Sequence, residues 1–138
     1  MAKVTICRKV SFSSGHRYYV PDHGEETNRA IYGSRFSSAG FGHNFLLHVY
    51  LEGEVDQLTG MVVNLKDVDA LVREVVEPLD HHYLNADVPF FQEVVPTAEN
   101  IALYCFRQIR RRLDSDSVRL KQVRLYEGDD LWVDCGED

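Results

Sequence analysis

The sequence predicts an α+β fold in which two helices cover one face of a four-stranded antiparallel sheet. Apolar and polar residues alternate in four segments, two in the first half of the chain and two near its C-terminal end, which is typical of half-buried strands. Between these pairs of strands, two segments repeat their apolar residues with the period of a helix. The order strand-strand-helix-helix-strand-strand contains no repeat or linker and indicates a single domain over residues 1–138.

The first two strands are expected on either side of a long polar loop. Residues 4–12 alternate, and so do residues 45–54, which place His48 and Tyr50 on one face. The other face of this second strand carries the apolar side chains Phe45, Leu47, Val49 and Leu51. Residues 17–40 are rich in Gly, Ser and charge, and a loop of that length in a small domain is usually functional or mobile.

Two helices and a hairpin complete the predicted fold. The first helix has an apolar stripe formed by Val68, Leu71, Val72, Val75, Val76 and Leu79. It is expected to end near Pro78, and the second helix is expected to begin near Pro96 with Thr97 as its N-cap. Residues 118–126 and 131–135 alternate again and predict a closing hairpin.

The predicted sheet has two open edges. Pairing of edges between subunits is one way in which a protein satisfies such edges. We therefore expect a homo-oligomer.

Composition argues against several classes of function. The net charge of −7 disfavours a general nucleic-acid binder. No apolar run approaches the length of a membrane span, and the N-terminal residues lack the apolar core of a signal peptide, so we expect a cytoplasmic protein with no membrane partner. The three cysteines lack CxxC spacing and predict neither a disulfide framework nor a four-cysteine zinc site.

Two histidines are candidates for a metal site. His16 and His43 lie at ends of strands that flank the polar loop, where neighbouring strands could bring their imidazoles together. His48 and His82 are instead read as ordinary hydrogen-bonded residues. Asp80 directly precedes His81, and a carboxylate beside an imidazole can orient it as a general base.

Two glutamates each allow two readings. Glu99 at a helix start could interact with the helix dipole, and Glu127 at a strand end could be a solvated turn residue. Alternatively, a buried carboxylate could accept two N–H bonds from a cyclic, guanidine-like ring. The residues alone leave both readings open.

Seven ordered segments of the chain carry a resemblance to a known family. These are FSSGHR (12–17), EETNRAIYG (25–33), GFGHNF (40–45), GMVVNL (60–65), EPLDHHYLN (77–85), PTAEN (96–100) and VRLYEG (123–128). Together they resemble the 6-pyruvoyl-tetrahydropterin synthase and 6-carboxy-tetrahydropterin synthase family. The resemblance implies the ββααββ tunnelling fold, in which subunits assemble through their sheets into barrels, commonly hexamers made of two trimers.

The resemblance also implies a zinc site and a proton-abstracting cysteine, and this chain departs from both. The family binds zinc through the histidine of FSxxH and both histidines of HGH, which correspond to His16, Phe41 and His43. His23 is a candidate for the third ligand, unless zinc is absent. The family's cysteine corresponds to Arg35 when the loop is aligned with members that have a longer loop, and to Ser37 when it is aligned with members that have a shorter one.

The remaining family positions are intact. Asp80 and His81 match the catalytic Asp-His relay. Thr97, Glu99 and Glu127 match the pterin-binding residues, with Glu127 as the anchor of the amino-pyrimidine edge. Arg35 cannot serve as a base, but its guanidinium could bind a triphosphate or a carboxylate.

Three functional readings follow from this combination. The first is a lyase with altered active-site chemistry that acts on 7,8-dihydroneopterin triphosphate or a related reduced pterin. The second is a degenerate member that binds a pterin or purine-like ring without the family reaction, which Phe41 and Arg35 favour. The third is an interaction subunit without a ligand, which requires Glu127 to be exposed to solvent.

Overall fold

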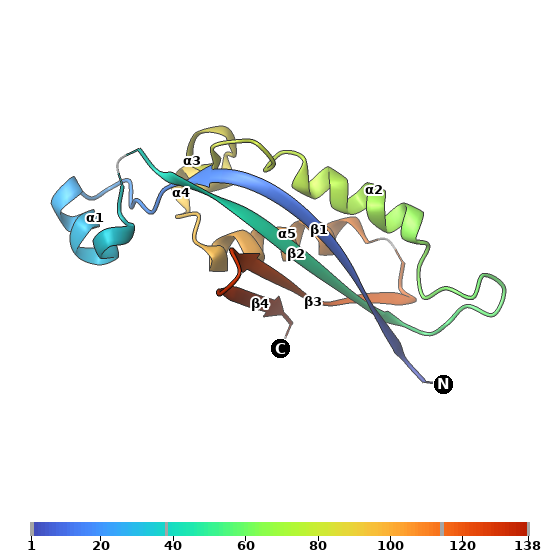
Figure 1. The fold of residues 1–138 in the computed structure, drawn as a ribbon. Helices are drawn as coiled ribbons and strands as arrows, with labels where there is room; N and C mark the ends of the chain where they lie inside the picture. Colours follow the sequence, from blue (N-terminus) through green and yellow to red (C-terminus); the bar gives the residue numbers. More distant parts are fainter. Residues whose placement is uncertain (1, 38, 114, 138) are drawn as a thin grey trace.

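The chain forms an α+β fold built on a four-stranded antiparallel sheet, and this confirms the predicted fold class. The computed structural model describes residues 2–37, 39–113 and 115–137. Its elements are β1 (Val4–His16), α1 (Glu25–Tyr32), the 3₁₀ helix η1 (Gly33–Arg35), β2 (Phe41–Gly53), α2 (Leu65–Val76), α3 (Leu84–Asp87), α4 (Phe90–Glu93), α5 (Ala98–Arg112), β3 (Val118–Glu127) and β4 (Trp132–Gly136). Neighbouring strands pair in the order β1-β2-β3-β4 (Figure 1).

Helices α2 and α5 cover one face of the sheet, as expected (Figure 1). The core between these layers is formed by fully buried side chains, among them Leu47, Val49, Ile101, Val123 and Leu125. The alternation predicted for β2 is confirmed, because His48 and Tyr50 lie on the face away from the helices and His48 contacts Tyr126 there. Among the described residues, no helix has the length and apolar character that crossing a membrane requires.

The prediction of a continuous loop over residues 17–40 is wrong. Helices α1 and η1 lie within it and form a separate lobe at one end of the molecule (Figure 1). The side chain of Asn28 is fully buried and organises this lobe by accepting a hydrogen bond from the backbone N–H of Val20 and donating to the carbonyls of Val20, His23 and Gly24. Asn28 is the one buried residue of α1, so polar bonds rather than buried apolar side chains hold this helix in place.

The connection between the two main helices also contains structure that the sequence did not reveal. The short helices α3 and α4 occupy it, and α2 ends at Val76, close to the predicted end. The N-cap prediction for α5 is confirmed, because the Thr97 hydroxyl accepts a hydrogen bond from the backbone N–H of Asn100 at 3.2 Å.

The outer edge of β1 is covered at one end by the segment that follows α2. The backbone N–H of His81 donates to the carbonyl of Ser13, and the N–H of Gly15 donates to the carbonyl of His82. Tyr83 then forms an isolated parallel bridge with Gly15. Among the described residues, no further backbone bond reaches this edge between Val4 and Phe12, so that part of it is open.

Candidate functional site

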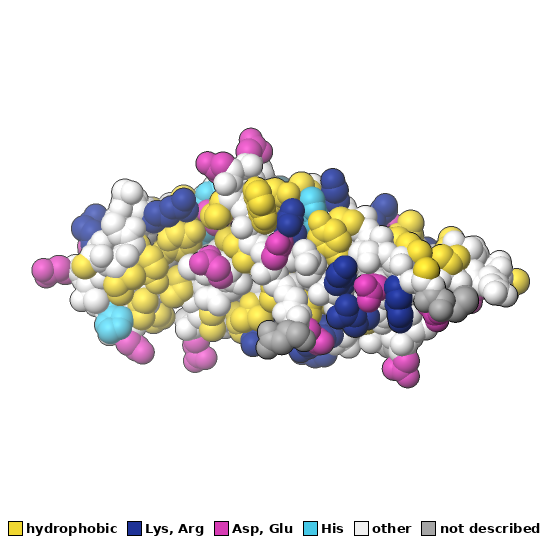
Figure 2. Space-filling view, turned by 90° about the horizontal axis from the view of Figure 1, so that it is seen from below, with side chains coloured by type: hydrophobic (Ala, Val, Ile, Leu, Met, Phe, Trp, Pro, Cys, Tyr) yellow, Lys and Arg dark blue, Asp and Glu magenta, His cyan; other side chains and the backbone are white. Residues whose placement is uncertain are grey.

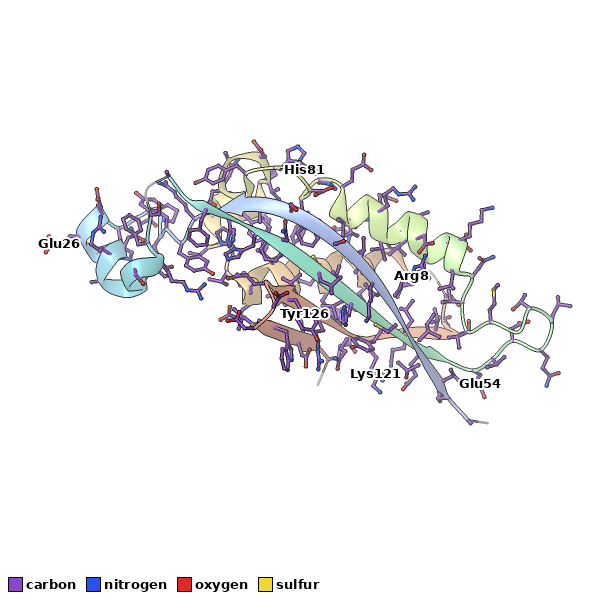
Figure 3. All side chains as sticks on the ribbon, in the orientation of Figure 1. Arg8, Glu26, Glu54, His81, Lys121 and Tyr126 are labelled. Carbon is purple, nitrogen blue, oxygen red and sulfur yellow. The ribbon has the colours of Figure 1, made fainter. Side chains whose placement is uncertain are left out.

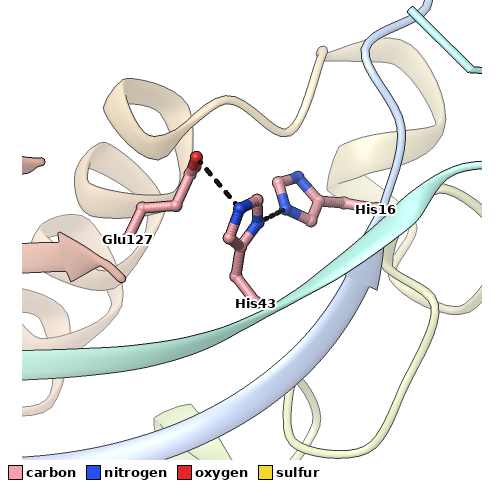
Figure 4. Close-up of side chains that lie close together, drawn as sticks. All are labelled: His16, His43 and Glu127. Carbon is pink, nitrogen blue, oxygen red and sulfur yellow. Dashed lines mark hydrogen bonds and ion pairs between the residues drawn. The ribbon is translucent and has the colours of Figure 1, made fainter. Parts of the chain in front are cut away.

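Three polar side chains from three strands meet on the helix-covered face of the sheet. His16 on β1 lies opposite Phe41 on β2, and Phe45 on β2 lies opposite Glu127 on β3. His43, between these positions, has its Nδ1 atom 2.8 Å from Nε2 of His16 and its Nε2 atom 3.5 Å from Oε1 of Glu127 (Figure 4). The prediction that neighbouring strands bring the two imidazoles together is therefore confirmed.

Hydrogen bonding fixes which nitrogen of His16 carries a hydrogen. Its Nδ1 atom lies 2.8 Å from the carbonyl oxygen of Pro96, which can only accept, so Nδ1 donates. The ring is fully buried, and burial lowers the pKa of His16 below its ordinary value and favours the neutral form. The lone pair of Nε2 therefore points into the cluster, toward His43.

Glu127 is a buried carboxylate with three polar neighbours. Only 1% of its side chain is exposed, which excludes the reading of a solvated turn residue. Besides His43, Nη1 of Arg35 lies 3.1 Å from Oε1, and the Tyr18 hydroxyl donates to Oε2 at 3.3 Å. Burial and then the charge of Glu127 raise the pKa of Tyr18 to about 12, so Tyr18 remains a donor near neutral pH.

The aromatic ring of Phe41 packs against this cluster. The ring centroid of Phe41 is 4.9 Å from that of His16, and 5.3 Å from those of Tyr18 and His43, all in edge-to-face contact. These contacts hold the imidazoles in place but supply no ligand atom. Phe41 therefore gives this end of the site an apolar wall.

Asp80 and His81 lie on the other side of the β1 end. Oδ1 of Asp80 accepts a hydrogen bond from the backbone N–H of Ser13 at 2.9 Å and lies 3.6 Å from Nε2 of His81. The His81 side chain is 82% exposed, and its backbone has a left-handed φ of 60°. In Figure 3 it projects from the turn after α2. His81 and His43 both line an open hollow of about 350 Å³.

The other predicted residues, Thr97, Glu99 and His23, lie outside the cluster of His16, His43 and Glu127. Thr97 caps α5 and directly follows Pro96, whose carbonyl binds His16. Glu99 is exposed in the first turn of α5, where its charge suits the helix dipole. His23 is exposed at the start of the α1 lobe and does not belong to the group of His16, His43 and Glu127.

Comparison with known proteins identifies the family of this chain. The model of the 6-pyruvoyl tetrahydropterin synthase family matches residues 5–138. The chain belongs to this family. It is 39% identical over 125 residues to the 6-pyruvoyl tetrahydrobiopterin synthase of Pongo abelii, which covers 90% of this chain and 85% of the relative.

Two further matches are one solved structure and one relative with a different name. The structure of the Caenorhabditis elegans 6-pyruvoyl tetrahydropterin synthase matches with a TM-score of 0.94 and 33% identity, covering 100% of this chain and 98% of that one. The dihydroneopterin monophosphate aldolase of Pyrococcus furiosus is 39% identical over 93 residues, 67% of this chain and 75% of the relative.

The clustered residues of this family member fit a divalent metal ion. The ligand atoms of His16, His43 and Glu127 all lie within 4.8 Å of one another. Two imidazoles and one glutamate form a donor set found in catalytic zinc sites. The bond from His16 to the Pro96 carbonyl also matches the outer hydrogen bond that orients most metal-binding histidines.

Sequence reasoning missed Tyr18 and the contact between Arg35 and Glu127. Tyr18 follows His16 by two residues, and this spacing would have placed both on one face if the strand had been extended. The path of the α1 lobe, which carries Arg35 to the end of β3, has no comparable signal in the sequence. The sequence predicted Glu127 as a residue that binds the ring of a ligand. Its position beside both histidines is evident only from the fold.

Proposed function

We propose that this chain is a lyase that acts on a reduced pterin, with 7,8-dihydroneopterin triphosphate or a related phosphorylated pterin as substrate. Membership of the 6-pyruvoyl tetrahydropterin synthase family supports the reaction class. The names of its relatives include a synthase and an aldolase, so the family admits more than one bond cleavage. The observation that carries the proposal is the buried carboxylate of Glu127 beside two imidazoles, of which that of His43 also lines an open hollow.

In the proposed reaction, each group has a separate task. Glu127 accepts hydrogen bonds from the amino-pyrimidine edge of the pterin, whose two adjacent N–H groups suit a carboxylate. Thr97 and Glu99 bind the ring at its margin, and Arg35 binds the anionic side chain. His81, oriented by Asp80 near its Nε2 atom, removes the carbon-bound proton as general base at its other ring nitrogen, Nδ1.

Zinc is the metal that we propose for the cluster. In the pterin-free protein, His16 and His43 would hold it with Glu127 in the third position, for which His23 was the sequence-based candidate. When the pterin ring binds Glu127, the side-chain oxygens of the substrate would take that third position. Zinc would act there as a Lewis acid on these oxygens. Altered chemistry is part of the proposal, because Phe41 stands where the family has a histidine ligand and either Arg35 or Ser37 stands where it has the cysteine.

Zinc binding should distinguish Glu127 from His23. The protein is first loaded with zinc, and excess zinc is removed by dialysis. We then expect inductively coupled plasma mass spectrometry to find close to one zinc ion per chain. His16→Ala and Glu127→Gln should lose most of it, whereas His23→Ala should retain it. Circular dichroism would check that each variant is folded. Loss of zinc from His23→Ala together with full retention by Glu127→Gln would assign the third position to His23 instead.

The proposed reaction is tested by incubating the purified protein with 7,8-dihydroneopterin triphosphate and zinc. Liquid chromatography with mass spectrometry would follow loss of substrate and new masses. We expect either triphosphate elimination or side-chain cleavage. Unchanged substrate under conditions where the pterin binds would contradict the lyase proposal.

That outcome would support a second candidate, a protein that binds a pterin or purine-like ring without the family reaction. The favouring observations are the packing of Phe41 against both imidazoles and the ion pair between Arg35 and Glu127. The third reading, an interaction subunit without a ligand, required an exposed Glu127, and the buried carboxylate argues against it.

We also propose that the chain forms a homo-oligomer through its sheet edges, with a hexamer as the expected assembly. The open part of β1 and the outer edge of β4 both offer unpaired backbone groups. Large apolar side chains are exposed at these edges and on the α1 lobe: Val4, Trp132 and Ile31. In Figure 2, hydrophobic side chains gather at the α1 end of the molecule.

A further inference from the structure

We propose that Arg35 makes the site selective for pterins with an anionic side chain, because its guanidinium competes with the ligand ring for Glu127 until an anion draws it away. The inference rests on the proposed function, since it takes Glu127 as the carboxylate that receives the ring. It goes beyond that function by giving Arg35 opposite effects on charged and uncharged ligands.

The competition follows from the chemistry of the donors. A guanidinium and the amino-pyrimidine edge of a pterin both present adjacent N–H groups that suit one carboxylate. In the structure, Nη1 of Arg35 already lies 3.1 Å from Oε1 of Glu127. A ring that binds Glu127 through both oxygens must therefore take over this hydrogen bond.

Arg35 is the partner of Glu127 that can leave most readily. Its side chain is 54% exposed, whereas that of His43 is 26% exposed and the whole Tyr18 residue is 7% exposed. Arg35 ends η1, a single short turn, while Tyr18 packs against Phe41 and Tyr32. Displacement of Arg35 thus disturbs less packing than displacement of either other neighbour.

A displaced Arg35 needs a new partner, because its guanidinium stays charged at any physiological pH. A phosphate or carboxylate on the ligand provides one, and Arg binds such groups through two parallel hydrogen bonds. An uncharged side chain provides none, so the ligand loses the ion pair without replacing it. The same residue therefore opposes one class of pterin and favours the other.

Removal of Arg35 should change the affinities for two ligands in opposite directions. In Arg35→Ala, neopterin should bind about tenfold more tightly, and neopterin triphosphate about tenfold more weakly, which is the scale of one charge-assisted hydrogen bond. Arg35→Lys keeps the charge but not the planar fork, and should lie between wild type and Arg35→Ala for both ligands.

Isothermal titration calorimetry of the full chain, with EDTA present, would measure both ligands against each variant. Arg29→Ala is the matched control, because Arg29 lies on the neighbouring α1 with its guanidinium paired to Glu25. It should leave both affinities unchanged. Opposite shifts in Arg35→Ala support the inference, whereas shifts in the same direction, or none, overturn it.

Glu127→Gln separates this inference from the proposed function. If both pterins bind wild type in a Glu127-dependent way while Arg35→Ala changes them alike, selectivity by Arg35 is overturned and the proposed anchor survives. If neither pterin binds, or if binding is indifferent to Glu127→Gln, the proposed function fails and the inference fails with it.

Discussion

Glu127→Gln is expected to weaken pterin binding by roughly 2–5 kcal/mol, about 30-fold to several thousandfold, the range for breaking a buried charged contact. Glutamine keeps the shape of the side chain but removes its charge, and one of its two acceptor positions becomes a donor. That donor would face the N–H groups of the ring, and Arg35 would lose its ion pair. Fluorescence titration with neopterin in EDTA would measure the effect without a contribution from metal.

Glu52→Gln is the matched control for this substitution. Glu52 is also a strand carboxylate paired with an arginine, Arg119 at 3.2 Å, but it lies at the other end of β2. Its replacement should leave pterin affinity unchanged. Affinity of Glu127→Gln within threefold of wild type, in a protein that unfolds normally, would remove Glu127 from the role of anchor.

His81→Ala is expected to lower the turnover number by about 10²–10⁴-fold, which is the usual contribution of a positioned general base. Pterin affinity should stay close to that of wild type, because His81 is 82% exposed and has no contact with Glu127 among the described residues. Single-turnover measurements with 7,8-dihydroneopterin triphosphate would separate the chemical step from binding. Asp80→Asn should lower the rate less, since it disturbs only the orientation of the imidazole.

The neighbouring histidine provides the control for this prediction. His82 is also exposed, and its Nδ1 atom lies 2.8 Å from the carbonyl oxygen of Asp80. His82→Ala should therefore retain the wild-type rate. Equal rates for His81→Ala and wild type, or an equal loss in His82→Ala, would contradict a proton transfer by His81.

Apolar periodicity was sufficient to predict the sheet and the two main helices. Residues such as Leu47 and Val49 on β2, or Val72 on α2, repeat at the period of the element that they occupy and are buried as a result. Helix α1 buries no apolar side chain in this way, because its one buried residue is Asn28. A helix held by the four hydrogen bonds of one amide side chain cannot be recognised from an apolar stripe.

The part of the site that lies at the strand ends could be predicted from the sequence. The part that the α1 lobe and its connection to β1 contribute could not. His16 and His43 were paired correctly, because antiparallel strands bring residues at their ends together. The burial of Glu127 remained open, since Tyr18 and Arg35 cover it from a segment whose path the sequence does not reveal. Long-range packing, rather than any local pattern, makes Glu127 a buried carboxylate.

The covered end of β1 has a further consequence for assembly. Residues 81–83 occupy the outer edge at Ser13 and Gly15, so a strand from another subunit can pair with β1 only as far as Phe12. In the proposed oligomer, the segment would act as a stop that limits how far the incoming strand can slide. Since a slip by one residue would turn every side chain of that strand to the opposite face, such a stop would help to select one register between the subunits of the proposed oligomer.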